Sequence, residues 1–590
     1  MAHPRSAASA ALLVVLTAAG MSPAQEGLER VALTGVQVGN ATLFSLGAPA
    51  VTESGHAAFV AFTSAGNRAY AGVPGALQAV VRSGFPAPGL PGLTLQTLNN
   101  EIIVSPSGKI AFSGVLSGQG VTLLNDEASW VGGDGSFAPY YREGTVYPGY
   151  PLPSMFGIGV QTANDQGAAL LPLTVAGFQL SSSWCRQDGA FEARNVVQTP
   201  APGAANYPPN PPDPGYTPVF DSFFLSALSP SGVNVFAALT TANRVGRTGI
   251  WLNDGDAIIP IALSRSDNTE DGFHSAIPSL GLHFRKNAPA VNNDQTVVFA
   301  ASRWVGDGTN ATYPALFRWR PGEGLTRLFR EGDDAPGGGQ IGLATTTTQN
   351  CRVGGGGHIV FVGETGVRAP FPSPQPPQAL YAGLPGAPMG MSGFFRVLAA
   401  GQQAAGLPEG TVFAEAPQTV FINASGDLAF PITVSGPQIG VRTCLYRAVL
   451  TPDGYQLSLV ARTGQAVEIA PGDLRFISTV TVPEVSSGGE DGFSTIINNA
   501  GVITFTASFA NGGQAVFRTG PTSPVCDSLD FNNDGLFPDS LDLADFVAVF
   551  GGGACSNDPH CTDIDFNNDG LYPDNEDILS FFRVFGGGGC

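Results

Sequence analysis

The sequence is poor in charge, and its few cations are almost all arginine. Only 13% of the 590 residues are charged, with 27 basic and 47 acidic side chains, a net charge of −20, and Lys109 and Lys286 as the only lysines. This balance argues against nucleic acid as a partner, because nucleic-acid-binding domains present a basic surface. After the N-terminus no run reaches the roughly 18 continuous apolar residues of a membrane helix. We therefore expect no membrane span in the mature chain.

Residue types that commonly carry catalysis are also scarce. Beyond residue 24, histidine occurs only at His56, His274, His283, His358 and His560. No two of them have the spacing of a helical zinc site. The segment around Ser392 lacks the strand-turn-helix context of a nucleophile elbow, and no glycine-rich loop that could hold a phosphate opens a helix.

Acidic pairs are the remaining candidates for chemistry in the body of the chain. Asp333-Asp334 and Glu490-Asp491 could act as acid and base on a glycan, but both pairs sit in glycine-flanked segments. Such positions are typical of solvated loops, which makes that the favoured interpretation. We nominate no catalytic residue, and the body is expected to be non-enzymatic.

The N-terminus has the pattern of a secretory signal peptide. Met1 to Arg5 is short and basic, Ala7 to Gly20 is apolar, and Ser22-Pro-Ala24 supplies small residues for cleavage. Residues 1–24 are therefore predicted to direct export, with an uncleaved N-terminal anchor as the alternative. The mature protein is expected to be secreted or held at the cell surface.

One turn-and-strand motif recurs along the body. Its clearest copy is Asn423-Ala-Ser-Gly426-Asp-Leu-Ala-Phe430, and eight copies, 53 to 75 residues apart by subtraction, begin at Thr52, Ser105, Asn164, Ser229, Asn292, Gly354, Asn423 and Asn498. Gly at the fourth position suits a turn that needs positive φ, and Asn or Ser at the first can cap it. Gln295 replaces that Gly in one copy, so we expect the fifth turn to differ.

Each copy is followed by a second strand with one aromatic residue, which we interpret as a core residue because it recurs in every unit. The eight aromatics are Tyr70, Trp130, Trp184, Trp251, Phe317, Tyr381, Tyr446 and Phe517. A third strand ends in Gly, as in Val460-Ala-Arg-Thr-Gly464. With one further strand, a unit has room for four short antiparallel strands, the content of a propeller blade.

The two ends of the body complement one another. The last unit stops after Phe517 without its glycine-ended strand, whereas Arg30-Val-Ala-Leu-Thr-Gly35 is a good copy of that strand. Pairing the two would remove two exposed sheet edges. Residues 25–522 are therefore predicted to form a mainly β, eight-bladed β-propeller with N-terminal strand closure. An open β-solenoid or two smaller barrels are the alternatives.

The turns Ser105-Pro-Ser-Gly108 and Ser229-Pro-Ser-Gly232 resemble those of Tol-type propeller repeats, and the Asn-x-x-Gly set is similar to tandem repeats of exported planctomycete proteins. The resemblance covers residues 28–518. Two proline-rich insertions, Pro200 to Pro218 and Pro370 to Pro377, are expected to be surface loops. A polysaccharide is a candidate ligand of these loops, because loops on a rigid scaffold often bind.

The last part of the chain, residues 523–590, is a separate acidic unit that we call the C-terminal module. It contains twelve Asp, Glu576 and Arg583, so that 13 − 1 = 12 of the excess negative charges lie here. Two segments align at an offset of 35, Asp530-Phe-Asn-Asn-Asp-Gly and Asp565-Phe-Asn-Asn-Asp-Gly. Oxygen side chains at alternate positions with Gly at the sixth are typical of a calcium loop. Apolar residues at helical spacing follow each loop.

These two loop-helix units, without leading helices, resemble a dockerin domain, and the tail ending in Cys590 is similar to terminal dockerins of planctomycete proteins. The resemblance implies two Ca²⁺ ions. Their ligands would be Asp530, Asn532, Asp534 and the Leu536 carbonyl in the first loop, and Asp565, Asn567, Asp569 and the Leu571 carbonyl in the second. At the closing position twelve the chain has Leu541 and Glu576, and we favour Asp542 and Asp577, one residue later. Asp539 and Asp574 are reserve candidates, and Glu576 alone fits the ordinary EF-hand register.

Four of the seven cysteines frame the C-terminal module: Cys526, Cys555, Cys561 and Cys590. In an exported protein they are expected to form two disulfides. The resemblance favours Cys526–Cys590 with Cys555–Cys561, and pairing within each repeat is the competitor. Cys185, Cys351 and Cys444 remain in the body, and this odd number means that at least one should be unpaired or linked elsewhere.

The sequence thus predicts a secreted, non-catalytic repeat protein whose dockerin implies docking to a cohesin-like or cell-surface receptor. The alternative is a propeller glycan hydrolase or lyase, active in polysaccharide degradation and targeted by the same module. That alternative predicts arginines and carboxylates converging at the central mouth of the propeller. The receptor, any substrate and any catalytic residue are not visible in the sequence.

Overall fold

The computed structural model describes residues 28–133, 135–145, 154–157, 162–175, 181–187, 190–195, 201, 219–242, 245–263, 273–275, 289–304, 312–343, 351–367, 376–388, 390–519, 529, 531–532, 540–557, 561, 564, 566 and 575–585. The expected signal peptide and most of both proline-rich insertions lie outside these residues. None of the described helices is both long and apolar enough to span a membrane.

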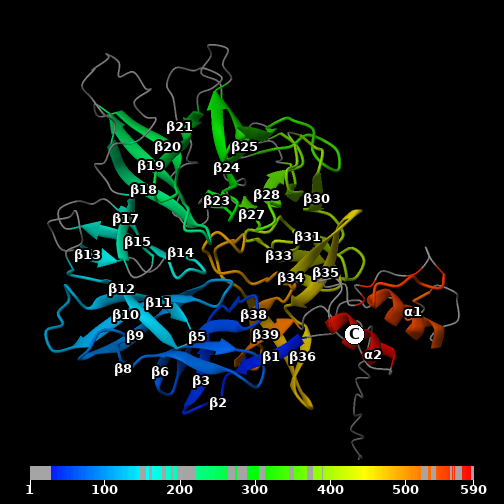
Figure 1. Ribbon diagram of the computed structural model, residues 1–590, viewed down its shortest axis with the longest axis horizontal. Coiled ribbons are helices and arrows are strands. Elements are labelled where there is room, and N and C mark those ends of the chain that lie inside the picture. The colour runs from blue at the N-terminus through cyan, green and yellow to red at the C-terminus, as the bar shows by residue number, and fades with distance from the viewer. Residues whose placement is uncertain are drawn as a thin grey trace, which may run out of the picture.

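The chain is mainly β, and its strands form separate antiparallel sheets arranged around a centre (Figure 1). The first sheet holds β2 (Gln37–Val38), β3 (Ala41–Leu46), β4 (Ala50–Val51), β5 (Ala57–Thr63), β6 (Gly66–Gly72) and β7 (Gln78–Arg82). The second holds β8 (Phe85–Pro86), β9 (Leu93–Val104), β10 (Ile110–Gly118), β11 (Glu127–Gly133) and β12 (Ser136–Arg142). The third holds β13 (Ser154–Gly157), β14 (Thr162–Ala163), β15 (Ala169–Val175), β16 (Ser181–Gln187) and β17 (Ala190–Asn195).

The next sheets follow in chain order. The fourth holds β18 (Val219–Leu228), β19 (Asn234–Ala242), β20 (Val245–Asn253) and β21 (Ile258–Leu263). The fifth holds β22 (Phe273–Ser275), β23 (Ala290–Val291), β24 (Val297–Trp304), β25 (Thr312–Arg320) and β26 (Gly324–Arg330). The sixth holds β27 (Arg352–Val353), β28 (Ile359–Glu364), β29 (Gln378–Gly383) and β30 (Phe394–Ala399).

The last two sheets and the helices complete the described chain. The seventh sheet holds β31 (Val412–Phe413), β32 (Phe421–Ile422), β33 (Leu428–Gly436), β34 (Gly440–Thr451) and β35 (Gly454–Arg462). The eighth holds β36 (Ala466–Ala470), β37 (Asp473–Thr481), β38 (Thr504–Phe509), β39 (Gln514–Thr519) and the N-terminal β1 (Leu28–Leu33). The C-terminal module contributes α1 (Ser540–Phe550) and α2 (Asn575–Phe585). The expected pairing of the two ends of the body is present, because β1 lies antiparallel to β39 with Arg30 opposite Phe517.

The recurring aromatic residues form the centre of each sheet's core, as predicted. In seven units the aromatic is at most 1% exposed: Tyr70, Trp130, Trp251, Phe317, Tyr381, Tyr446 and Phe517. Each stacks on the phenylalanine that ends the turn motif, as Phe112 does on Trp130 with ring centroids 5.1 Å apart. The side chain of Trp184 lies outside the described residues. A cross-strand aromatic pair is therefore the repeated packing element of the body.

The first residue of the turn motif makes one hydrogen bond within its own turn and another to the turn of the next unit. Asn423 accepts the amide of Asp427 on Oδ1 at 2.9 Å and donates from Nδ2 to the carbonyl of Asn498, also at 2.9 Å. Asn498 in turn donates to the carbonyl of Thr52 at 3.0 Å. The eighth turn is thereby hydrogen-bonded to the first, although the two are separated by more than 440 residues.

The prediction that the fifth turn differs is wrong. Gln295 adopts φ of 58°, close to the 87° of Gly426, and its amide bonds to Asn292 O at 3.0 Å as the motif requires. Gln295 is the one non-glycine residue in the described chain with positive φ. The tertiary context therefore imposes the left-handed conformation on a residue that disfavours it.

Replacing Gln295 with Gly is expected to stabilise the protein. The left-handed region costs a side-chain-bearing residue about 1–2 kcal/mol, and the greater freedom of Gly in the unfolded chain offsets part of the gain. We expect a net increase of about 0.5–1 kcal/mol in the free energy of unfolding, measured by urea denaturation. Gly426→Ala is the opposite control, because its added methyl would lie 2.7 Å from the His358 ring. Equal free energies of unfolding for wild type and Gln295→Gly would contradict the assignment of backbone strain to Gln295.

Candidate functional site

The centre of the body is filled by residues 482–503, which join β37 to β38 and which we call the axial segment (Figure 1). It hydrogen-bonds to every sheet before its own. The contacts run from Val51 N to Thr495 O (2.9 Å), Val104 N to Ser494 Oγ (3.0 Å), Ala163 N to Gly492 O (2.9 Å), Leu228 N to Asp491 O (3.0 Å), Asn293 N to Glu490 Oε2 (3.0 Å), Arg352 Nε to Ser486 O (2.9 Å) and Ile422 N to Ser487 O (3.1 Å). One segment thus contacts the innermost part of all the other sheets.

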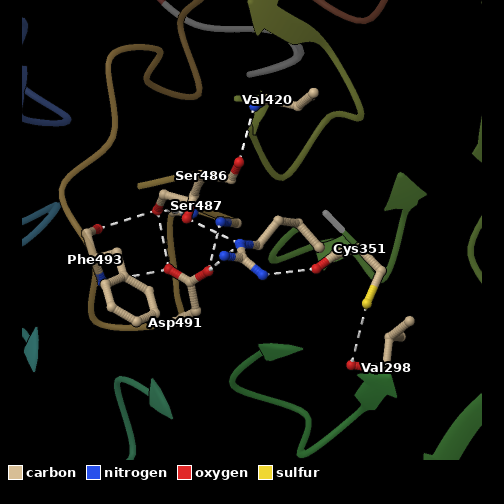
Figure 2. Close-up of polar contacts among 10 residues, drawn as sticks. Val298, Cys351, Val420, Ser486, Ser487, Asp491 and Phe493 are labelled. Atoms are coloured by element: carbon tan, nitrogen blue, oxygen red, sulfur yellow. Dashed lines mark hydrogen bonds and ion pairs between the residues drawn. The ribbon is translucent and has the colours of Figure 1, made fainter. Parts of the chain in front are cut away.

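An ion pair lies at the middle of this segment (Figure 2). Arg352 Nε, on β27, is 3.7 Å from Asp491 Oδ2, and the side chains of the two residues are 1% and 0% exposed. Arg352 also donates from Nη1 to the carbonyl of Cys351 at 2.8 Å. Its guanidinium carbon is 5.9 Å from the centroid of the Phe493 ring, a cation–π contact.

Asp491 is held by several donors besides Arg352. Its carboxylate accepts the amide of Gly488 at 2.8 Å, the hydroxyl of Ser487 at 2.9 Å and the amide of Phe493 at 3.3 Å (Figure 2). Burial raises the pKa of Asp491, while Arg352 and these hydrogen bonds oppose the rise. The interpretation of Glu490-Asp491 as a solvated pair is therefore wrong for Asp491.

The one thiol beside this pair is not an activated nucleophile. Burial raises the pKa of Cys351 to about 11, and its Sγ donates to Val298 O at 3.7 Å. A protonated thiol is a weak nucleophile. Cys351 and Cys444 are both free and buried, which agrees with the expectation of an unpaired cysteine in the body.

Carboxylates gather where the turns surround the axial segment. Glu53 accepts the amide of Asn499 at 3.1 Å, and Asp165 accepts the amide of Ser107 at 2.8 Å. Burial, followed by the charges of Asp165 and Glu490, raises the pKa of Glu53. The pKa of Glu490 is raised as well, by burial first and then by Asp294 and other acidic neighbours. Carboxylates therefore converge here, but the axial arginine, Arg352, is 0% exposed.

A second acidic group lies at the edge of the second sheet. Glu143 is 3% exposed, and burial raises its pKa to about 6, with the nearby charge of Glu127 and then Asp126 adding to the rise. The amide of Glu143 donates to the Glu127 carbonyl at 2.9 Å, which fixes the two strands in register. Glu143 is thus placed to hold a proton at mildly acidic pH.

Stability is expected to depend on this proton. The pKa of Glu143 is 4.5 unperturbed and about 6 in the folded protein, so the native state binds the proton more tightly than the unfolded state. This contribution is complete below pH 4.5 and is lost as the pH rises through about 6. Urea midpoints measured across this window should fall with pH in wild type and fall less in Glu143→Gln. The exposed Glu409→Gln control should keep the wild-type slope, and an unchanged slope in Glu143→Gln would refute the assignment.

The C-terminal module has a core with approximate two-fold repetition. Its buried residues are Leu529, Phe531, Phe546, Ile564, Phe566 and Phe581, and they pair at the offset of 35, since 564 − 529 = 566 − 531 = 581 − 546. Phe546 of α1 stacks on Phe581 of α2 with ring centroids 4.0 Å apart. Equivalent residues of the two repeats therefore pack against each other.

The predicted calcium ligands fall only partly within the described residues. Asn532, Asp542 and Asp577 are described and are 1%, 0% and 0% exposed. Asp530, Asp534, Leu536, Asp565, Asn567, Asp569 and Leu571 lie outside, as do the reserve candidates Asp539 and Asp574 and the side chain of Glu576. Among the described residues no group of three or more His, Cys, Asp or Glu is placed to hold a metal ion.

The first repeat brings oxygen-bearing side chains together from its loop and its helix. The amide of Asn532 donates to Asp542 Oδ1 at 3.4 Å, and its Nδ2 donates to Asp545 Oδ2 at 3.3 Å. Burial raises the pKa of Asp545, but hydrogen bonds from Ser556 and Asn532 outweigh it, and the net shift is downward. Asp542 and Asp577 both lie in the first turn of their helices, and their role as calcium ligands stays a prediction.

Sequence reasoning missed Asp545, although it is buried, anionic and bonded to the loop. The signal was present, because Asp545 is an acidic residue within an otherwise apolar helical stripe. One of the expected disulfides is formed, between Cys555 and Cys561. Cys526 and Cys590 lie outside the described residues.

Arg352 was also missed. It stands two residues before the sixth turn motif, where the other seven units have Ala50, Ile103, Thr162, Ala227, Ala290, Phe421 and Ile496. A single charge at an otherwise uncharged position of a repeat indicates a role outside the repeat. Its partner Asp491 could not be identified in the same way, since it lies between repeats.

Comparison with solved structures shows likeness in fold only. Dipeptidyl peptidase 4 of Porphyromonas gingivalis aligns with a TM-score of 0.41 and 10% identity over 81% of this chain and 58% of that one. Prolyl oligopeptidase B of Galerina marginata gives 0.32 and 12%, over 79% and 55%. The polysaccharide lyase Uly1 gives 0.32 and 12%, over 72% and 92%. The chain thus spans little more than half the length of the two peptidases.

Comparison at the level of sequence adds a family. No curated protein matches the sequence. The family of unknown function DUF7453 matches residues 18–271 and 204–519, which together cover the whole body. The match ends before the C-terminal module begins.

Proposed function

The chain belongs to DUF7453, a family of unknown function, and we propose from its own geometry that it is an exported, non-catalytic scaffold. The sheets form one closed eight-bladed propeller. The C-terminal module is a dockerin that binds two Ca²⁺ ions and attaches the propeller to a cohesin-like or cell-surface receptor. Residues 1–24 direct the export.

The axial contacts and the linked turns support the closed ring. Hydrogen bonds from the axial segment reach the strands or turns of the other sheets, and Asn498 links the last turn to the first. Pairing of β1 with β39 covers the edge that β39 would otherwise expose. An open solenoid would leave its first and last units apart, so these contacts favour the ring.

The observation that carries the docking proposal is the equivalence of Asp542 and Asp577. They are related by the offset of 35, both are 0% exposed, and both lie in the first turn of a helix that follows an Asp-rich loop. A buried carboxylate needs a partner of opposite charge or several donors. Both carboxylates already have contacts within the module, and a calcium ion held by each loop would add a positive charge beside them.

Calcium binding by the full-length protein tests the proposal. Isothermal titration is expected to give two ions per chain, and Asp542→Asn or Asp577→Asn should each remove one. The exposed Asp473→Asn control should keep both. A pull-down from envelope and secreted fractions, in calcium and in chelator, should then retain one receptor in calcium alone. The proposal would be refuted if the chain takes up no calcium. It would also be refuted if the double variant Asp542→Asn/Asp577→Asn captures the receptor as well as wild type does.

A glycan hydrolase or lyase with the same module is the second candidate. Glu53 and Glu490, whose pKa values are raised by burial and by acidic neighbours, favour it because glycoside hydrolysis uses paired carboxylates. Wild type and Glu53→Gln/Glu490→Gln should be assayed on a panel of neutral and uronate polysaccharides. Turnover by wild type that the double variant loses would establish this function instead.

A further inference from the structure

A cavity of about 370 Å³ lies in the first sheet, where the β2–β3 hairpin meets the strands β6 and β7. We call it the hairpin cavity, and the residues that line it are Val38, Gly39, Asn40, Arg68, Leu77, Gln78, Ala79 and Arg82. These residues include two arginines and no acidic side chain, although acidic residues outnumber basic ones in the chain. The volume lies at the lower end of the range for small-molecule sites, about 300–1,000 Å³.

Arg68 is a buried cation on the wall of this cavity. It is 1% exposed, and its Nη1 donates to Asn40 Oδ1 at 2.8 Å, which fixes the guanidinium in position. Its Nε is also buried and has no hydrogen-bond partner among the residues that the structure describes. A buried charge is stable only when it is paired and its donors are satisfied. Arg68 therefore needs an acceptor that this part of the chain does not provide.

The other buried arginines of the described chain each have a carboxylate partner. Arg318 Nη2 lies 3.7 Å from Glu323 Oε2, and Arg352 Nε lies 3.7 Å from Asp491 Oδ2. Arg68 forms no such ion pair within the described residues. The contrast indicates that its counter-charge comes from outside the chain.

The repeat itself does not require an arginine at this position. Arg68 precedes the buried aromatic Tyr70 by two residues. The other seven units have a small uncharged residue there: Ala128, Ser182, Gly249, Ala315, Ala379, Cys444 and Ala515. Since the other sheets form without a charge at this position, Arg68 has a role beyond the packing of its own unit.

A second guanidinium belongs to the same wall. Arg82 of β7 lies directly opposite Arg68 of β6 in the antiparallel pair. Arg82 is exposed, and its guanidinium carbon lies 5.6 Å from the centroid of the Phe85 ring. Like charges directly opposite each other on neighbouring strands are destabilising. An anion bound beside them would relieve this repulsion and supply the missing counter-charge.

We propose that the hairpin cavity binds a small organic anion through a carboxylate, sulfate or phosphate group. The anionic group would lie beside Arg68 and Arg82 and would accept a hydrogen bond from Arg68 Nε. A guanidinium suits these groups because its planar donors match two of their oxygens at once. The apolar side chains Val38, Leu77 and Ala79 would contact the uncharged part of the ligand.

Isothermal titration of the full-length protein at constant ionic strength tests the proposal. The probes are D-glucuronate, glucose monosulfate and glucose monophosphate, which carry the three anionic groups on one kind of sugar, with D-glucose as the neutral control. At least one anionic probe should bind wild type, and glucose should bind at least about tenfold more weakly, since hydrogen bonds to charged groups contribute on that order. The probe that binds most tightly identifies the anionic group.

Variants of the two arginines locate the site. Arg68→Met keeps an unbranched side chain but removes the charge, so it should weaken binding of that probe at least about tenfold. Arg82→Gln, a change at an exposed residue, should also weaken it. The matched control is Arg330→Gln, which should bind as wild type does. Arg330 has the same place in the glycine-ended strand of the fifth sheet, is also exposed and lies 5.0 Å from the centroid of the Tyr313 ring.

Three results would overturn the proposal. They are the failure of all three anionic probes to bind, equal binding of glucose, and undiminished binding by a folded Arg68→Met. If Arg68→Met does not fold, the comparison of Arg82→Gln with Arg330→Gln decides alone. None of these readouts depends on calcium or on Glu53 and Glu490, so failure here leaves both functional candidates standing.

Discussion

Asp491→Ala is expected to lower the free energy of unfolding by about 3–5 kcal/mol, the usual cost of breaking a buried ion pair by removing one partner. The substitution would leave Arg352, whose side chain is 1% exposed, without its counter-charge. It would also strand the donors Ser487 and Gly488, which both bond to the Asp491 carboxylate. Because the axial segment contacts all the other sheets, we expect the loss to affect the whole body.

Urea denaturation of the full-length protein, followed by tryptophan fluorescence, measures this effect. The matched control is Asp473→Ala, which removes an ion pair of 2.9 Å with Arg475 at the surface and should leave the midpoint unchanged. The double variant Arg352→Met/Asp491→Leu should recover only part of the lost stability, since an apolar pair removes the uncompensated charge but leaves the donors Ser487 and Gly488 without their acceptor. A shift in Asp491→Ala no larger than that of Asp473→Ala would refute a structural role for the axial pair.

Phe581→Ala is expected to unfold the C-terminal module. Truncating a buried phenylalanine costs about 3–5 kcal/mol, and a domain of this size rarely has more than a few kcal/mol of stability in its core. Phe581 is 0% exposed and contacts Phe546, Phe566 and Phe585. Loss of the α1/α2 contact should also abolish the proposed calcium binding, because Asp542 and Asp577 lie on these two helices.

The neighbouring residue provides the control. Phe582 lies on the same helix but is 48% exposed, so Phe582→Ala should leave folding and calcium stoichiometry intact. Limited proteolysis in calcium, with mass detection, would show release of the module in Phe581→Ala alone. Equal resistance of both variants would show that the two-fold core is not what holds the module together.

Much of the body could be predicted from the repeat. The repeat predicted the aromatic that is buried in seven units, and the incomplete last unit identified β1 as the partner of β39. These inferences succeeded because the repeat spacing, the turn residues and the core positions all indicate the same arrangement of strands within a unit. Gln295 was misjudged because sequence alone gives local preference, whereas the surrounding turns fix its conformation.

The axial segment was not predicted, although one unusually long spacing between turn motifs indicated extra residues. The longest spacing between motifs, 75 residues from Asn423 to Asn498, contains most of it. Reasoning from repeats treats extra residues as an insertion and places them on the surface. Here they lie at the centre, where their backbone and side-chain groups hydrogen-bond to the seven other sheets. Contacts of this kind are long-range, and no local pattern encodes them.

The sequence indicated which residue types could form the candidate metal site. It did not indicate which neighbouring residues would hydrogen-bond to them. Asp542 and Asp577 are both 0% exposed and Leu541 is 52% exposed, and the choice of these two carboxylates as calcium ligands stays a prediction. The role of Asp545 depends on Ser556 and Asn532 meeting it in space. A calcium-loop pattern specifies positions within the loop only, so it does not indicate which helical residue will support the loop.

The position of the axial segment late in the chain has a consequence for biogenesis. Its contacts with Val51 and Val104 cannot form until about 490 residues have been made, and at 5–20 residues per second that takes roughly 25 to 100 s. Throughout this time β1 also lacks its partner β39. The early sheets must therefore stay free of aggregation, with the edge of β1 unpaired, until the last unit has been made.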